Sequence, residues 1–332
     1  MRLRRVMGRG SAELEIGVGT GWVPAAELVA RLSPAPEGPV ARSWSSDSVA
    51  LMGAPRCVRE SLARLAQDGP ARHDDGVRVL LPFEPRSFRD FMIYERHAVD
   101  AARGFVERFM PRLAPVARLY ERATGGTFPA FRPKPLWHRQ PIYYMGNHLA
   151  FVPDGADIVR PAYTHALDWE LELGIVLARP LYNASPAEAE AAIGGFVVVN
   201  DFSARDVQLA EMASGFGPQK AKHFANAMSS VVVTADEILP RWRALNGTVR
   251  LDGKLIATPP TSGSRWTLGE MLAQASRGER LWPGELLATG TLPGGSGIET
   301  GHELVPGNVI EVAIEGIGSV GNRIVAEEET AS

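Results

Sequence analysis

The segment D-W-E-L-E-L-G, residues 168–174, alternates three carboxylates with large apolar side chains. In a β-strand successive side chains point to opposite faces, so Asp168, Glu170 and Glu172 would share one face and the apolar side chains the other. The simplest interpretation is a strand whose polar face lies in water. A role for these acids in chemistry requires further polar groups that reach the same face.

The stretch F-R-D-F-M-I-Y-E-R-H places Asp90 and His97 seven residues apart. The apolar spacing from Phe88 to about Leu119 is helical, and seven residues make two helical turns, so we expect Asp90 and His97 on one face of a helix. A helix cap and a solvated histidine would explain the two residues equally well.

The stretch V-V-V-N-D-F-S-A-R-D-V-Q ends an apolar strand at Asp201 and places Arg205 and Gln208 four and seven residues further on. If a helix begins there, Asp201 would cap it, and Arg205 and Gln208 would share its face. A cap with a salt bridge is one interpretation. A polar cluster at the end of a buried strand is also where functional groups are commonly displayed.

Two later stretches add lysine side chains and a further glutamate. G-P-Q-K-A-K-H-F holds Lys220 and Lys222 two residues apart, so one face of an extended chain serves a site. The glycine-rich G-T-L-P-G-G-S-G-I-E ends at Glu299. It is not a Walker loop, because no Gly-Lys-Ser/Thr closes it, and no G-x-S-x-G nucleophile elbow occurs in the sequence. Serine-hydrolase chemistry therefore loses its usual signature.

The elements that must position these side chains are mostly strands. Apolar runs bounded by turns predict strands at I-Y-Y-M, H-L-A-F-V, E-L-G-I-V-L, G-F-V-V-V-N and S-S-V-V-V-T, and a hairpin around Asp252-Gly253. Helices are expected at Pro186–Ile193 and Thr267–Ala275. This order is not a repeated βαβ pattern, so we expect a mixed α+β, β-rich fold and not a doubly wound sheet.

The chain changes character around Pro82–Ser87, which predicts a small N-terminal module over residues 1–82 and a larger domain over residues 83–332. The module's G-V-G-T-G lacks the third spaced glycine of a dinucleotide site and predicts a turn. The expected elements of the module are a strand at Ala12–Ile16, a short helix after Pro24, a loop over residues 33–48 and a helix at Val58–Leu65.

Composition limits the class of protein. The 332 residues are 45% hydrophobic and 22% charged, as in globular proteins, and the net charge of −3 with interspersed basic residues argues against nucleic-acid binding. No apolar run of about 18 residues and no signal-peptide stretch occurs, so we expect a cytoplasmic protein that does not bind membranes. Cys57 is the only cysteine, which excludes an internal disulfide or cysteine metal cluster, and we expect it to be a small buried hydrophobe.

Six stretches occur together in one order between about Phe88 and Val325: D-F-M-I-Y-E-R-H, L-D-W-E-L-E-L-G, N-D-F-S-A-R-D-V-Q, G-F-G-P-Q-K-A-K-H-F, P-G-E-L-L-A-T-G-T and P-G-N-V-I-E-V-A-I-E-G-I-G. On these motifs the sequence resembles the fumarylacetoacetate hydrolase family. The resemblance implies that family's catalytic fold, irregular mixed β-sheets in a roll with flanking helices, and a homodimer. The N-terminal module is similar to the variable leading domain of longer family members.

The resemblance also implies a divalent-metal site. Its ligands would be Asp90, Glu170, Glu172 and Asp201. Four converging carboxylates repel one another unless a hard cation lies between them, and all-oxygen ligation favours Mg²⁺, or Mn²⁺ or Ca²⁺, over Zn²⁺. Asp168 matches no family ligand and would lie behind the site at most.

As a family member the chain would cleave a carbon–carbon bond in an acylpyruvate or fumarylacetoacetate-like 1,3-diketone acid, through a metal-stabilised enolate. His97 would activate water as general base and Glu299 would orient it. Donors to the substrate carboxylate and to the developing oxyanion would be Arg205, Gln208 and Lys222, with Lys222 preferred over Lys220 because it precedes H-F.

Departures from the family leave the substrate open. Met92 stands where many relatives carry Tyr, and His223 where Asp or Ser is commoner. Tyr143, Tyr144 and Asn147 would line the pocket or belong to the core. The alternatives are a non-hydrolytic metal-enolate enzyme, namely a decarboxylase, isomerase or tautomerase, or hydratase, and a scaffold that binds metal and a small acid without turnover.

Overall fold

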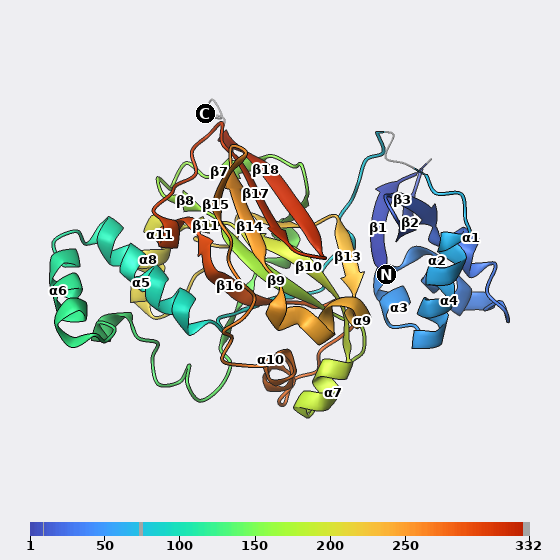
Figure 1. Ribbon diagram of the computed structural model, residues 1–332, viewed down its shortest axis with the longest axis horizontal. Coiled ribbons are helices and arrows are strands. Elements are labelled where there is room, and N and C mark those ends of the chain that lie inside the picture. Colours follow the sequence, from blue (N-terminus) through green and yellow to red (C-terminus); the bar gives the residue numbers. More distant parts are fainter. Residues whose placement is uncertain (9, 73–75, 328–332) are drawn as a thin grey trace.

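The chain folds around a large mixed β-sheet and a smaller sheet, in a computed structural model that describes residues 1–8, 10–72 and 76–327 (Figure 1). The large sheet has the order β3-β2-β1-β13-β10-β9-β16-β4-β5, with β12 beside β10 and β6 beside β12. The small sheet has the order β15-β14-β17-β18-β7, and β11 pairs with β8. The strands are β1 (Arg2–Met7), β2 (Ala12–Val18), β3 (Gly21–Pro24), β4 (Phe88–Phe91), β5 (Tyr143–Gly146), β6 (Phe151–Pro153), β7 (Ile158–Arg160), β8 (Leu167–Asp168), β9 (Glu170–Leu177), β10 (Ile193–Asp201), β11 (Ser203–Ala204), β12 (Asn226–Met228), β13 (Val231–Thr234), β14 (Gly247–Leu251), β15 (Lys254–Ala257), β16 (Leu286–Ser296), β17 (Val309–Ile314) and β18 (Gly318–Ala326).

Helices flank the sheets. In Figure 1 α1 to α4 gather beside β1 to β3, and α5 and α6 lie at the opposite end of the molecule. The α-helices are α1 (Ala25–Val29), α2 (Gly38–Ser46), α3 (Ser48–Met52), α4 (Arg56–Gln67), α5 (Glu95–Phe109), α6 (Ala114–Thr124), α7 (Pro186–Ala191), α8 (Arg205–Ser214), α9 (Ala235–Ile238), α10 (Leu268–Ala275) and α11 (Gly297–Thr300), and 3-10 turns occur at Pro129–Phe131, His148–Ala150 and Leu239–Ala244. The expected mixed α+β, β-rich fold is confirmed.

The central strand β9 is covered on both faces. Leu171 and Leu173 belong to a core cluster that includes Val312 of the small sheet, whereas Val176 packs in a second cluster with Leu51 of α3. A strand buried on both faces loses the solvated side that the alternating pattern suggested. The interpretation of residues 168–172 as a half-solvated strand is therefore wrong, and the three acids are buried.

The N-terminal residues continue the large sheet, because β1 pairs antiparallel with β13, with Leu3 opposite Val232. The predicted strand at Ala12–Ile16, the following turn and the helix around Val58–Leu65 are confirmed. The predicted loop over 33–48 is wrong, since α2 and the start of α3 lie there, with Pro39 in the first turn of α2. Cys57 is exposed on α4, so its predicted burial is also wrong.

Two predictions around the candidate site are wrong. The chain from Phe88 is not one helix, because β4 pairs in parallel with β16 before α5 and α6 begin, so Asp90 lies on a strand and His97 on a helix. Asp201 does not cap a helix either. It is the last residue of β10, opposite Asn226 of β12, and Ala204 stands at the N-cap of α8. The other predicted strands, the Asp252-Gly253 hairpin and the two later helices are present, except that His148–Ala150 of the predicted strand H-L-A-F-V form a 3-10 turn and β6 begins only at Phe151.

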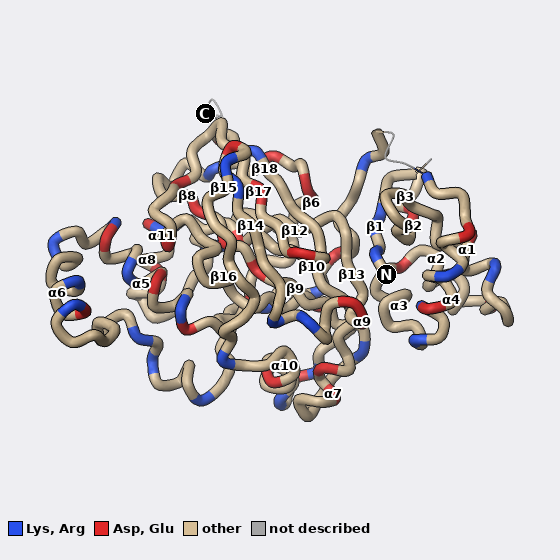
Figure 2. Tube along the Cα trace, viewed as in Figure 1, with Lys and Arg blue, Asp and Glu red and all other residues tan. Residues whose placement is uncertain are grey.

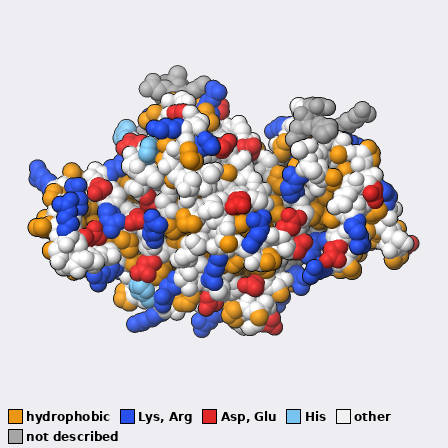
Figure 3. Space-filling model, in the orientation of Figure 1, with side chains coloured by type: hydrophobic (Ala, Val, Ile, Leu, Met, Phe, Trp, Pro, Cys, Tyr) orange, Lys and Arg blue, Asp and Glu red, His pale blue; other side chains and the backbone are white. Residues whose placement is uncertain are grey.

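Charges of both signs are interspersed along the chain (Figure 2). On the face that Figure 3 shows, basic and acidic side chains of the described residues also alternate, and no continuous basic stripe is visible there. No helix in the part of the chain that the structure describes is both long and apolar enough to cross a membrane.

Candidate active site and metal centre

The carboxylates of Asp90, Glu170, Glu172 and Asp201 converge in the structure. Each offers an oxygen that lies within 4.8 Å of the others, and all four residues are buried. Sheet register explains the convergence. Glu172 lies opposite Val199 of β10 on one side and Thr291 of β16 on the other. β4 brings Asp90 in beside β16, and Asp201 ends β10 at the same edge.

The electrostatics of these acids divide them into two kinds. Oδ1 of Asp90 and Oε2 of Glu172 are buried with no hydrogen-bond partner among the described residues. Burial and the charges of neighbouring acids raise the pKa of Asp90 and of Glu172 well above their usual values. Burial would raise the pKa of Glu170 as well, but Arg205 and Lys222 lower it overall. Unpartnered buried carboxylate oxygens at this spacing fit a hard divalent cation, which would satisfy them.

Lys222 reaches the cluster and Lys220 does not. The ammonium of Lys222 donates to Glu170 and to Oδ2 of Asp201, the latter at 2.5 Å. Burial would lower the pKa of Lys222, but the two carboxylates raise it overall, so the group stays charged. Lys220 lies outside, 5.4 Å from the ring centre of Tyr163. A buried ammonium held between two acids is placed to donate to an anionic substrate.

Arg205 occupies the other side of Glu170. Its Nη2 donates to Oε1 of Glu170 at 2.7 Å and its Nε to Oδ2 of Asp168 at 2.7 Å. Its Nη1 donates to Oε1 of Gln208 at 2.9 Å, so Gln208 joins the site through Arg205. The guanidinium is buried and lies between the carboxylates of Asp168 and Glu170.

His97 projects from α5 toward the same acids. Its Nδ1 lies 3.0 Å from Oε2 of Glu299, an ion-pair distance, although the ring is not aligned for a hydrogen bond. Its Nε2 lies 3.9 Å from Oε1 of Glu170. Burial alone would lower the pKa of His97, but the charge of Glu299 and that of Glu170 raise it overall. One nitrogen therefore faces Glu299 and the other faces the acidic cluster.

Glu299 is fixed by the turn in which it lies. Its carboxylate accepts hydrogen bonds from the Gly294 amide at 3.0 Å, from the Ser296 hydroxyl at 2.7 Å and from the Ser296 amide at 3.2 Å, the last of which belongs to the capping box of α11. Burial would raise its pKa, but His97 and these hydrogen bonds lower it overall. The acid beside His97 therefore stays ionised.

Three supporting side chains complete the site. The Tyr144 hydroxyl donates to Oδ2 of Asp201 at 2.8 Å, which places this predicted pocket residue at the acidic cluster. Sequence reasoning missed Asn226, whose amide nitrogen lies 2.6 Å from Oδ1 of Asp201 when its orientation is assigned from its neighbours, and Thr291, whose hydroxyl lies 3.4 Å from Oε1 of Glu172. Asn226 lies in no quoted motif and Thr291 is the last residue of P-G-E-L-L-A-T-G-T, and strand pairing with Asp201 and with Glu172 places them at the site.

The remaining predicted pocket residues lie at the margin. Tyr143 packs against Phe91, with ring centres 4.9 Å apart, and belongs to the core. The Asn147 amide donates to the carbonyl of His223 at 3.0 Å, which ties β5 to the loop that carries Lys222. Met92 is partly exposed, and its carbonyl accepts a hydrogen bond from Trp137 at 2.5 Å.

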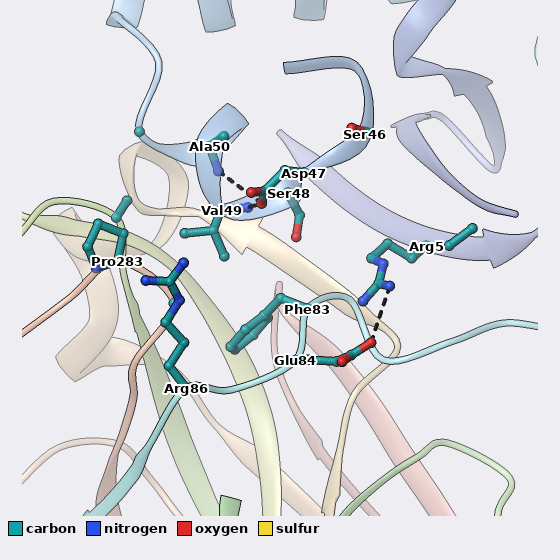
Figure 4. Close-up of a pocket in the computed structure, with 14 residues that line it drawn as sticks. Arg5, Ser46, Asp47, Ser48, Val49, Ala50, Phe83, Glu84, Arg86 and Pro283 are labelled. Atoms are coloured by element: carbon teal, nitrogen blue, oxygen red, sulfur yellow. Dashed lines mark hydrogen bonds and ion pairs between the residues drawn. The ribbon is translucent and has the colours of Figure 1, made fainter. Parts of the chain in front are cut away.

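A separate cavity of about 620 Å³ lies between α3 and the segment before β4 (Figure 4). Its labelled charged residues include Arg86 and Asp47, and Arg5 pairs with Glu84 at 3.4 Å. The balanced charges give this cavity no preference for an acid or a metal, unlike the carboxylate cluster.

Comparisons with known proteins show which sequences and structures the chain is similar to. The mitochondrial oxaloacetate tautomerase of Pongo abelii is 30% identical over 187 residues, 54% of this chain and 79% of that protein. The 4-hydroxyphenylacetate degradation bifunctional isomerase/decarboxylase of Escherichia coli is 28% identical over 192 residues, 57% of this chain and 42% of that protein. The fumarylacetoacetate hydrolase of Exiguobacterium antarcticum superposes with a TM-score of 0.70 at 21% identity, covering 98% of this chain and 100% of that one.

The sequence model of the fumarylacetoacetate (FAA) hydrolase C-terminal domain matches residues 116–325. This range includes Glu170, Glu172, Asp201 and Glu299, whereas Asp90 and His97 precede it. The match spans most of the chain, and the chain belongs to the fumarylacetoacetate hydrolase family.

Proposed function

We propose that the protein is a divalent-metal-dependent hydrolase that cleaves the carbon–carbon bond of an acylpyruvate or fumarylacetoacetate-like 1,3-diketone acid. The observation that carries the proposal is the placement of His97, whose Nδ1 faces Glu299 while Nε2 faces the acidic cluster. A base in this position would take a proton from water beside a metal-held substrate. The products of an acylpyruvate would be pyruvate and a carboxylic acid.

Asp90, Glu170, Glu172 and Asp201 would hold the cation, with Mg²⁺ or Mn²⁺ preferred and Ca²⁺ possible in size and ligand type. When bound, the cation would act as a Lewis acid toward substrate oxygens. Lys222 and Arg205 would bind the substrate carboxylate, because each is a buried cation that already faces carboxylates. Gln208 would orient Arg205, and we expect a homodimer as the working form.

A second candidate is a tautomerase or decarboxylase that acts on oxaloacetate or a similar 2-oxo acid. The names of the tautomerase and of the isomerase/decarboxylase relatives favour it. The same residues would serve this chemistry, since His97 would then move a proton on the substrate carbon instead of on water. A scaffold without turnover is disfavoured, because buried charges without a use are costly.

The test is to incubate the purified protein with a panel of acylpyruvates and with oxaloacetate, in Mg²⁺ or Mn²⁺, with and without EDTA. Loss of the enol absorbance with pyruvate and a second acid found by mass spectrometry supports the hydrolase. Release of carbon dioxide, or faster enol–keto exchange without cleavage, supports the second candidate. Metal-dependent stabilisation without any turnover would point to the scaffold.

A further inference from the structure

Asp168 is a buried carboxylate that is not among the candidate metal ligands. Its Oδ1 accepts hydrogen bonds from the amides of Trp169 and Gly297, each at 2.7 Å. Its Oδ2 accepts from Nε of Arg205 at 2.7 Å and from the amide of Ile298 at 2.9 Å. One carboxylate thus joins the end of β8 to the first residue of α8 and to the first turn of α11.

The two elements joined by Asp168 supply opposite halves of the candidate site. α8 begins with Arg205, whose other nitrogen contacts Glu170. α11 carries Glu299, the acid beside His97. A side chain at position 297 would collide with Oδ1 of Asp168, so the glycine there permits the close approach. The contact is therefore built into the backbone as well as the side chain.

We propose that Asp168 is a positioning residue that couples the substrate-binding guanidinium of Arg205 to the Glu299–His97 pair. The proposal rests on the proposed function and deepens it. Because the same oxygen of Asp168 receives both the Arg205 and the Ile298 donors, loss of that acceptor would release both halves at once. In Asp168→Asn an NH2 group replaces one of the two carboxylate oxygens. This group cannot accept a hydrogen bond, so it would face either the Trp169 and Gly297 amides or the Arg205 and Ile298 donors without bonding to them.

The test measures kcat, KM and Mn²⁺ affinity of Asp168→Asn. We expect kcat to fall about 10- to 100-fold and KM to rise, with Mn²⁺ affinity unchanged, because Asp168 orients Arg205 and α11 and is not one of the four acids that would hold the metal. A double-mutant cycle with Glu299→Gln follows. In the Glu299→Gln background Asp168→Asn should raise KM without lowering kcat further, whereas fully additive losses of kcat would overturn the coupling.

Two further variants separate positioning from folding. Asp206→Asn is the matched control, since Asp206 lies next to Arg205 and accepts from the Thr164 hydroxyl at 2.6 Å and the His165 amide at 2.9 Å. It should lower the melting temperature but leave kcat and KM unchanged. If Asp168→Asn does not fold, Gly297→Ala crowds Oδ1 of Asp168 and the carbonyl of His302, so it disturbs the Asp168 carboxylate and α11 together and should lower kcat and raise KM. An unchanged kcat in Gly297→Ala would overturn the proposal.

A binding measurement keeps the proposal apart from the proposed function. If the parent protein turns over no substrate, the hydrolase and tautomerase proposals fail, and oxalate binding to the Mn²⁺-loaded protein then reports on Arg205. Asp168→Asn should weaken oxalate binding about 10-fold and Asp206→Asn should not. Equal oxalate affinity of Asp168→Asn and the parent would overturn the role of Asp168.

Discussion

Oε2 of Glu299 lies 3.0 Å from Nδ1 of His97 and also accepts a hydrogen bond from the backbone amide of Ser296, the N-cap of α11, at 3.2 Å. The same carboxylate therefore ends a capping box and faces the candidate base. This double placement means that its structural and chemical roles can be separated, because glutamine supports a capping box but carries no charge.

We predict that Glu299→Gln folds with near-parental stability and lowers kcat about 100-fold or more, since the neutral amide no longer balances a proton on His97. Steady-state kinetics and a thermal melt check both parts. Glu270→Gln is the matched control, because Glu270 closes the capping box of α10 with Thr267. Equal kcat values for the two variants would exclude Glu299 as the orienting acid.

The strand that carries Glu170 and Glu172 was predictable from its alternation, and the side chains expected at one site do meet in the structure. The position of Asp90 on a strand was not predictable from the sequence. The apolar residues around Asp90 are compatible with a helix or a strand, and the segment forms a strand because it pairs with β16, almost 200 residues away in the sequence. Local spacing contains no information on that partner.

Other differences also depend on how the elements pack, which local spacing does not show. β10 continues through Asp201 because β12 supplies a partner at Asn226, which no cap pattern reveals. Cys57 lies on the face of α4 opposite the buried Leu62 and Ala66, so its type predicts burial but its position in the helix prevents it. Asp168 appeared to be one more acid on the strand, and its contacts with α11 depend on a loop 129 residues later.

We predict that Glu172→Gln abolishes metal binding while the metal-free protein becomes more stable by about 1 kcal/mol. The reason is that Asp90 and Glu172 face each other as buried acids, and removing one charge relieves their repulsion. Urea unfolding with and without Mn²⁺ measures this. At a Mn²⁺ concentration 100 times its Kd the parent should gain about 2.7 kcal/mol and the variant nothing.

Glu285→Gln is the control for that experiment, because Glu285 is also buried but pairs with Arg89. It should destabilise the metal-free protein and keep the full Mn²⁺ effect, since it breaks an ion pair away from the cluster. A Mn²⁺ effect that survives in Glu172→Gln would remove Glu172 from the ligand set.

We predict that part of the acid sensitivity of the protein comes from Glu211. Its carboxylate accepts the amides of Gln219, Lys220 and Ala221 at 2.7, 2.9 and 3.2 Å, in the loop that leads to Lys222. Burial would raise its pKa, but these hydrogen bonds lower it overall. A lowered pKa contributes stability that is present above about pH 4.3, the usual glutamate value, and is lost as the pH falls through the folded-state value.

Urea midpoints at pH 7 and near pH 4 check this for Glu211→Gln. The variant should be less stable than the parent at pH 7, and the difference should shrink as the pH falls. Glu60→Gln removes an acid whose contact is an exposed ion pair with Arg56, and it should show no such convergence. A stability difference for Glu211→Gln that is the same at both pH values would contradict the assignment.

The packing of α5 on α11 leads to the last prediction. At Gly104 of α5 a Cβ atom would collide with the carbonyl oxygen of Ile298 in α11, so the two helices can approach only with glycine there. Alanine at an ordinary helix position stabilises by roughly 0.5–1 kcal/mol relative to glycine. Gly104→Ala should instead destabilise by about 1–3 kcal/mol, because the collision forces the helices apart.

The same displacement should move His97 away from Glu299 and lower kcat, while Mn²⁺ affinity stays unchanged because α5 carries none of the proposed ligands. Gly126→Ala provides the comparison, since a Cβ there would meet its nearest atoms at an ordinary 3.7 Å. Chemical denaturation, steady-state kinetics and Mn²⁺ titration of both variants test the prediction. If Gly104→Ala kept full kcat despite its lower stability, the distance between α5 and α11 would not determine how His97 acts.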